Sequence, residues 1–161
     1  MIWNLIAHLL ARPAVTDWLI KRAQRTPYQH ITSADGSSVY MGRWWLFNAY
    51  PGAYGDHPQP RHIPWLPSIR IHHICRPDQD RDLHDHPWNA RTIVLRGWYR
   101  EERPFEQTTT RENSQHDGIN LMHGGIRLNF DREAGYTGRL LFGQYHRISE
   151  VSEGGVWTLF I

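Results

Sequence analysis

Residues 78–88 hold the densest group of side chains that could bind a metal or transfer a proton. They include His84 and His86, which are separated by a single residue. Because alternate side chains of a strand share a face, we expect both imidazoles to point one way and Asp85 to point the other way. Two imidazole nitrogens at this spacing can converge on one ion at roughly 2.0–2.1 Å. The pair predicts part of a metal site, while the alternative is an acidic turn whose histidines only form hydrogen bonds.

The single cysteine limits which metal ligands the chain can offer. Cys75 cannot form an internal disulfide, and a zinc finger built from cysteines alone is excluded. The chain has eleven histidines, so its metal chemistry must rest on imidazole and carboxylate groups. The basic residues are seventeen arginines and Lys21. Arginine suits planar, bidentate contact with anions, and codon usage is the alternative explanation of this bias.

Length and charge limit the class of protein and its partners. The 161 residues are enough for one domain with a hydrophobic core, so we expect a single domain over 1–161. The net charge is +2 and the arginines are scattered, which predicts no dedicated nucleic-acid binding. No apolar run approaches the roughly 18 residues that cross a bilayer, and the apolar start lacks the basic residues of a signal peptide. Together with the single thiol, this predicts a cytoplasmic protein without a membrane span.

The spacing of apolar residues changes once along the chain. Over 1–27 they recur at helical intervals, with Pro13 as a break or first-turn residue and Thr26-Pro27 as a stop. From about residue 38 to 161 the pattern becomes short β-rich runs separated by turn residues. The expected strands are 39–48, 68–75, 91–100, 126–130, 139–142 and 156–161, and the polar stretch 108–125 is expected to be a loop. This order predicts a mainly β sandwich or barrel with a short helical N-terminal prefix.

The β-rich region follows His84 and His86 with turn glycines and one further histidine: Gly97, Gly135, Gly143 and His146. At these six positions the sequence resembles the two motifs of the cupin superfamily. The segment 83–88, Leu-His-Asp-His-Pro-Trp, is also similar to a small group of phage and bacterial cupin-type proteins of no established activity. The resemblance implies a cupin-type jelly-roll barrel, or double-stranded β-helix. It also implies His84, His86 and His146 as metal ligands.

The chain departs from the cupin pattern at several positions. Ala90, or Arg91 at the longer spacing, stands where cupins carry a glutamate ligand, and Asp78 replaces the first glycine. In the second motif, Leu141 replaces a proline and Glu150 replaces an asparagine. Three histidines with an open position still suffice for a divalent ion such as Fe, Zn, Ni or Cu. The alternatives are a site completed by a nearby aspartate and a degenerate site that binds no metal.

Four residues near this site are candidates for catalysis. His72 could act as a general base, or it could orient a metal ligand through a hydrogen bond. The alternative is a histidine of the core that has no role in the site. Asp82 could share the strand face of the two histidines and supply an oxygen ligand. Arg91 could pair with an anionic substrate, although a surface salt bridge is the usual fate of such a residue. Tyr99 could act as an acid, whereas tyrosines on strands are more often core residues.

Three functions are compatible with these features. The first is a metal-dependent enzyme of dioxygenase or isomerase type that binds a small-molecule ligand in the barrel. The second is a non-catalytic cupin module for binding or structure. The third is a metal-free, epimerase-like sugar enzyme that uses a histidine and a tyrosine. The apolar last strand also indicates a possible homodimer.

Overall fold

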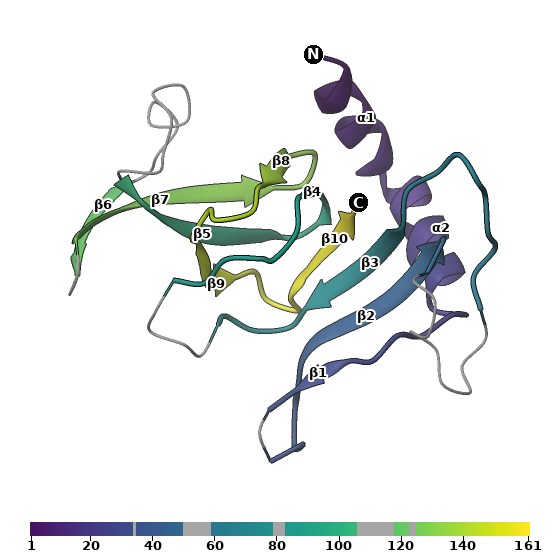
Figure 1. Ribbon diagram of the computed structural model, residues 1–161, viewed down its shortest axis with the longest axis horizontal. Coiled ribbons are helices and arrows are strands. Elements are labelled where there is room, and N and C mark those ends of the chain that lie inside the picture. The colour runs from purple at the N-terminus through teal and green to yellow at the C-terminus, as the bar shows by residue number, and fades with distance from the viewer. Residues whose placement is uncertain (34, 50–58, 79–82, 106–117, 123–124) are drawn as a thin grey trace.

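The computed structural model describes residues 1–33, 35–49, 59–78, 83–105, 118–122 and 125–161. Over these residues the chain forms two helices followed by ten strands (Figure 1). The elements are α1 (Ile2–Leu10), α2 (Pro13–Ala23), β1 (Ile31–Thr32), β2 (Val39–Phe47), β3 (Ile69–Ile74), β4 (Ala90–Arg96), β5 (Trp98–Pro104), β6 (Gly118–Met122), β7 (Gly125–Glu133), β8 (Thr137–Leu140), β9 (Arg147–Val151) and β10 (Val156–Phe160).

The described strands form two antiparallel sheets. The larger sheet has six strands in the order β1-β2-β3-β10-β4-β8, and the smaller has four in the order β6-β7-β5-β9. In Figure 1 the two sheets lie beside each other, and the chain passes from one to the other between β4 and β5. The prediction of a mainly β fold with a helical prefix is confirmed. Closure of the sheets into a cupin-type barrel stays a prediction.

The two faces of the larger sheet carry different chemistry because side chains alternate along each strand. On β3, Ile71 faces the helices, whereas Arg70 and His72 line a cavity on the opposite face. On β10, Leu159 faces the helices and Phe160 lines the same cavity. One face therefore holds the apolar core, and the other places polar groups in the cavity.

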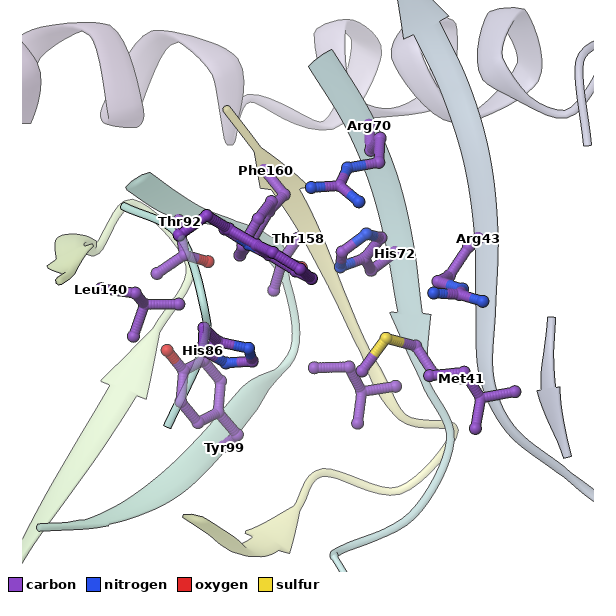
Figure 2. Close-up of a pocket in the computed structure, with 13 residues that line it drawn as sticks. Met41, Arg43, Arg70, His72, His86, Thr92, Tyr99, Leu140, Thr158 and Phe160 are labelled. Atoms are coloured by element: carbon purple, nitrogen blue, oxygen red, sulfur yellow. The ribbon is translucent and has the colours of Figure 1, made fainter. Parts of the chain in front are cut away.

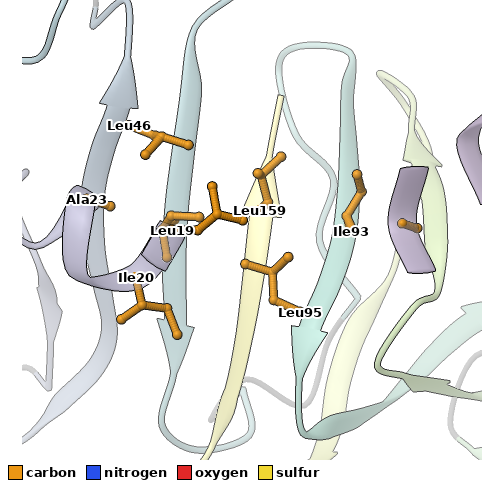
Figure 3. Packing of buried hydrophobic residues seen from close by; sticks show 9 residues of the cluster. Leu19, Ile20, Ala23, Leu46, Ile93, Leu95 and Leu159 are labelled. Atoms are coloured by element: carbon orange, nitrogen blue, oxygen red, sulfur yellow. The ribbon is translucent and has the colours of Figure 1, made fainter. Parts of the chain in front are cut away.

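The two helices cover the apolar face of the larger sheet. Pro13 begins α2, where its missing N–H costs no hydrogen bond, and Lys21 lies in the last turn, where a cation suits the helix dipole. Leu19 and Ile20 of α2 pack against the strands, together with Ala7 of α1. Figure 3 shows Ala23 of α2 beside Leu46 of β2, and Leu19 of α2 beside Leu159 of β10. Ile93 and Leu95 of β4 belong to the same apolar cluster. Neither described helix is long and apolar enough to cross a membrane.

Most of the expected strands are present, and three further ones were not predicted. The expected strand 91–100 is two strands, β4 and β5, because Gly97 turns the chain between them. The prediction that 108–125 is a loop was partly wrong, because β6 lies inside this stretch. Residues 108–117 and 123–124 of the stretch lie outside the described residues. Strands β1 and β9 were also missed. β1 has only two residues and β9 is largely polar, so neither has the apolar pattern that predicts a strand.

Gly97 is required where the chain leaves the larger sheet. Its φ is +77°, in the left-handed region that glycine adopts without strain. A Cβ at this position would lie 2.5 Å from Ser152 Oγ and 2.7 Å from the Gly155 carbonyl oxygen. Gly143 has the same φ of +77°, but a Cβ there would meet no described atom within 4 Å. Substitutions at the two glycines can therefore distinguish the cost of backbone strain from the cost of close packing.

We predict that Gly97→Ala lowers the free energy of unfolding by about 2–5 kcal/mol, because strain and overpacking add. The matched control Gly143→Ala should lose only about 1–2 kcal/mol, from strain alone. Urea denaturation of both variants measures the difference. Equal losses would show that the Gly97 turn can move away from Ser152 and Gly155.

Candidate metal centre

Two distant segments of the chain meet at His84 and His146. The backbone N–H of each residue donates a hydrogen bond to the carbonyl of the other, and both distances are 2.9 Å. Residues that exchange both hydrogen bonds lie directly opposite each other, so their side chains leave the ladder on the same face. His86 follows His84 by two residues and shares this face, as the alternation predicts. The pairing brings all three imidazoles together.

The three imidazoles form a compact group of candidate ligands. One ring nitrogen from each of His84, His86 and His146 lies within 4.8 Å of the others. Two of these nitrogens, His86 Nε2 and His146 Nε2, are 3.0 Å apart. Nitrogens that hold one ion at about 2.1 Å lie roughly 3.4 Å apart in tetrahedral geometry. Small rotations of the rings would therefore close the group on a divalent ion.

Glu101, on β5, orients the His146 ring from behind. His146 Nδ1 lies 2.9 Å from Glu101 Oε1. An ionised carboxylate can only accept, so Nδ1 carries the proton and the Nε2 lone pair faces His86. Histidine ligands of metals commonly donate their second N–H to such a carboxylate, which fixes the tautomer and the ring orientation. Glu101 therefore leaves the Nε2 of His146 as the atom that could bind a metal.

Glu101 stays ionised because cations surround it. Its side chain is 1% exposed, and Arg103 Nη2 and Arg132 Nε lie 3.1 and 3.0 Å from its two oxygens. Burial by itself would raise the pKa of Glu101, but Arg103, the His146 hydrogen bond and Arg132 together hold that pKa below its usual range. The carboxylate thus remains an acceptor for His146 across the physiological pH range.

A second buried carboxylate lies beside His84. Asp78 Oδ2 accepts a hydrogen bond of 2.7 Å from the Ile148 N–H, and Tyr40 donates its hydroxyl to Oδ1. The Asp78 side chain is 7% exposed, and its Oδ2 is 4.0 Å from His84 Nδ1. At that distance the interaction is electrostatic rather than a hydrogen bond. Asp78 therefore adds negative charge close to the cluster.

His86 connects the histidine cluster to a cavity on the polar face of the larger sheet. Burial, and then the neighbouring His146 and His84, lower the pKa of His86 to about 4. The ring is therefore neutral near pH 7, which is the state that binds a metal. His86 also lines a cavity of about 230 Å³ (Figure 2). A molecule in this cavity would lie next to the candidate metal centre.

The four predicted catalytic candidates differ in their position relative to the cavity. His72 and Tyr99 both line the cavity, and both are buried. Arg91 does not line it, because its guanidinium lies 4.5 Å from the Trp3 ring centre and Nη1 donates to Thr137. Asp82 lies outside the described residues. Ala90, at the position of the missing glutamate, pairs with β8 and is not part of the histidine cluster.

Sequence reasoning missed both carboxylates that support the histidines. No role in the site was predicted for Glu101, and Asp78 was identified as the residue that replaces the first cupin glycine. A usable signal was present in β5, where Glu101 and Glu102 lie between Arg100 and Arg103 in the middle of the strand. Charged residues inside such a strand are buried only when they are paired.

No protein-family model matches the chain, and no curated protein sequence matches it at a significant level. The likeness to cupins therefore stays a prediction from the motifs, and the site geometry carries the functional conclusion.

We predict that Glu101→Gln weakens binding of Zn²⁺ or Co²⁺ by about 10–100-fold, because the neutral amide no longer fixes the His146 tautomer. Metal titration of the chelator-treated protein measures this change. Glu150→Gln is the control, since Glu150 pairs with Arg100 on an exposed part of the same sheet. Unchanged affinity in a folded Glu101→Gln protein would contradict the role of Glu101.

We predict that His72 makes stability depend on pH. Burial, then Arg70 and Arg43, lower the pKa of His72 to about 3 in the folded protein. Below an unfolded pKa of about 6.5 the unfolded chain gains a proton that the folded chain refuses, so stability is full above pH 6.5 and falls toward pH 3. When the pH falls from 7.5 to 5, the free energy of unfolding of His72→Gln should therefore decrease by about 2 kcal/mol less than that of wild type.

Denaturant titration at the two pH values measures this difference, and the exposed His62 gives the control His62→Gln. A His72→Gln protein with the same pH dependence as wild type would show that His72 accepts a proton in the folded state.

Proposed function

We propose that the protein is a metal-dependent, cupin-like enzyme for a small molecule, of dioxygenase or isomerase type. His84, His86 and His146 would hold a divalent transition metal, and the adjacent cavity would hold the substrate. The observation that carries the proposal is the convergence of three imidazoles beside a cavity, with Glu101 oriented behind one of them.

The donor set suits a catalytic rather than a structural ion. Structural zinc sites use four protein ligands, whereas catalytic sites keep a position open for water or substrate. Within the described residues, the cluster offers three ligands, and they come from two separate segments. When bound, such an ion supplies Lewis acidity, and iron adds the ability to react with O2.

The residues around the cavity would position the substrate. His86 is shared by the metal group and the cavity wall, so it marks the direction from which a substrate reaches the centre. Apolar side chains such as Met41, Leu140 and Phe160 exclude water from the same space. Exclusion of water strengthens electrostatic contacts within the site.

A non-catalytic binding module is the second candidate. His86 Nε2 and His146 Nε2 are at hydrogen-bond distance, so a shared proton could hold the cluster together without a metal. In that arrangement the cavity would still bind a ligand, but no chemistry would follow. Metal content separates the two candidates.

Metal-free epimerase chemistry has less support from the site. Tyr99 is the tyrosine of the cavity wall, and it would have to donate or accept a proton. Burial, followed by the charge of Glu101, raises the pKa of Tyr99 well above its ordinary value. A phenol in this environment is a poor proton donor near neutral pH.

We expect wild-type protein purified without chelator to carry about one transition-metal ion per chain, because three imidazoles and an open position suffice for binding. His86→Ala should remove most of it, whereas the control His62→Ala should retain it, because His62 is exposed and lies outside the cluster. Elemental analysis measures both. Absence of metal from wild type, together with no binding of added Zn²⁺, Fe²⁺ or Ni²⁺, would overturn the enzyme proposal.

A further inference from the structure

The cavity beside His86 has one strongly basic wall. Arg70 and His72 come from β3, and Arg43 comes from the neighbouring strand β2. In Figure 2 these three side chains lie together on one side of the pocket, and His86 lies on the other side. Among the described residues that line the cavity, none is acidic. The wall therefore presents positive and hydrogen-bonding groups that face a metal ligand across the cavity.

The strand register builds this wall. Arg43 lies directly opposite His72 on the adjacent strand, and Arg70 precedes His72 by two residues, so all three share one face of the sheet. The Arg43 Nε donates to the Gln29 carbonyl at 2.6 Å, and the Arg70 guanidinium lies 4.9 Å from the Phe160 ring centre. These contacts position the two guanidinium groups before a ligand arrives.

Burying several basic groups beside one another has a cost in free energy. Arg70 is 6% exposed and His72 is 8% exposed. Burial, and then the charge of Arg70, lower the pKa of Arg43, and the same arginines add to the effect of burial on His72. His72 Nε2 is buried and forms no hydrogen bond with any described residue. An anion in the cavity would relieve the repulsion and give this nitrogen a partner.

The remaining walls define the rest of the ligand. Met41, Ile74, Leu140 and Phe160 are apolar, and Trp88 adds an aromatic surface. The volume of about 230 Å³ is smaller than the roughly 300–1,000 Å³ of sites for drug-sized molecules. The occupant is therefore small and carries both an anionic end and a hydrocarbon body.

We propose that the cavity binds a small carboxylate with an apolar body, its carboxylate against Arg43, Arg70 and His72 and its other end toward His86. Guanidinium groups match a carboxylate through paired N–H donors, and a neutral imidazole N–H adds a third donor. The inference rests on the proposed function, because it names the substrate class of the same site. The metal would then act on the end of the molecule remote from the carboxylate.

The test compares phenylacetate with its neutral isostere phenylacetamide, using calorimetry on chelator-treated wild-type protein. Phenylacetate should bind at least about tenfold more tightly, because the amide loses the charged contacts. Inorganic phosphate should compete weakly, since it lacks the apolar body. Equal binding of acid and amide, or phosphate binding as tight as phenylacetate, would overturn the proposal.

Variants assign the binding to the basic wall. Arg43→Met should weaken phenylacetate binding about tenfold or more and leave phenylacetamide unchanged. The control Arg61→Met should bind as wild type does, because Arg61 is exposed and lies outside the cavity. Phenylacetate binding that needs added Zn²⁺ and ignores Arg43→Met would place the carboxylate on the metal. That result would overturn this inference while supporting the proposed metal site, whereas the metal analysis above tests that site by itself.

Discussion

The two hydrogen bonds between the backbones of His84 and His146 are the constraint on which the candidate site depends. They bring the segment before β4 against the segment before β9, so the side chains of both histidines leave on the same face. Alternation along the chain then places His86, and the pairing of β9 with β5 places Glu101 behind His146. A shift of one residue in this pairing would turn His146 away from the cluster.

The smaller sheet supplies the charge that the site needs. Glu101 lies between Arg103 and Arg132, while the adjacent Glu102 faces the opposite way and binds Arg127 and Arg147. Pairs of this kind contribute little net stability compared with apolar residues, but loss of one partner leaves a buried charge uncompensated. Their role here is to hold one carboxylate ionised at a defined position behind an imidazole.

The parts of the structure that depend on local pattern were predictable from the sequence. Helical spacing predicted the two helices, and alternation predicted that His84 and His86 share a face. The supporting groups depend on contacts between distant segments, which no local pattern reports. Glu101 reaches His146 through the β5–β9 pairing, and Arg43 meets His72 through the β2–β3 register. Arg91 lies away from the cavity because its guanidinium stacks on Trp3 of α1, a contact that no local pattern reports.

The alternation of β3 and β10 has a consequence for how this protein can diverge. Ile71 and Leu159 hold the helices, whereas the residues next to them along each strand line the cavity. Substitutions on the cavity face therefore leave the packing of the helices largely intact. If the cavity binds a ligand as proposed, its specificity can change at Arg70, His72 or Thr158 without a matching repair of the core. Selection could thus retune what the molecule recognises while the scaffold stays the same.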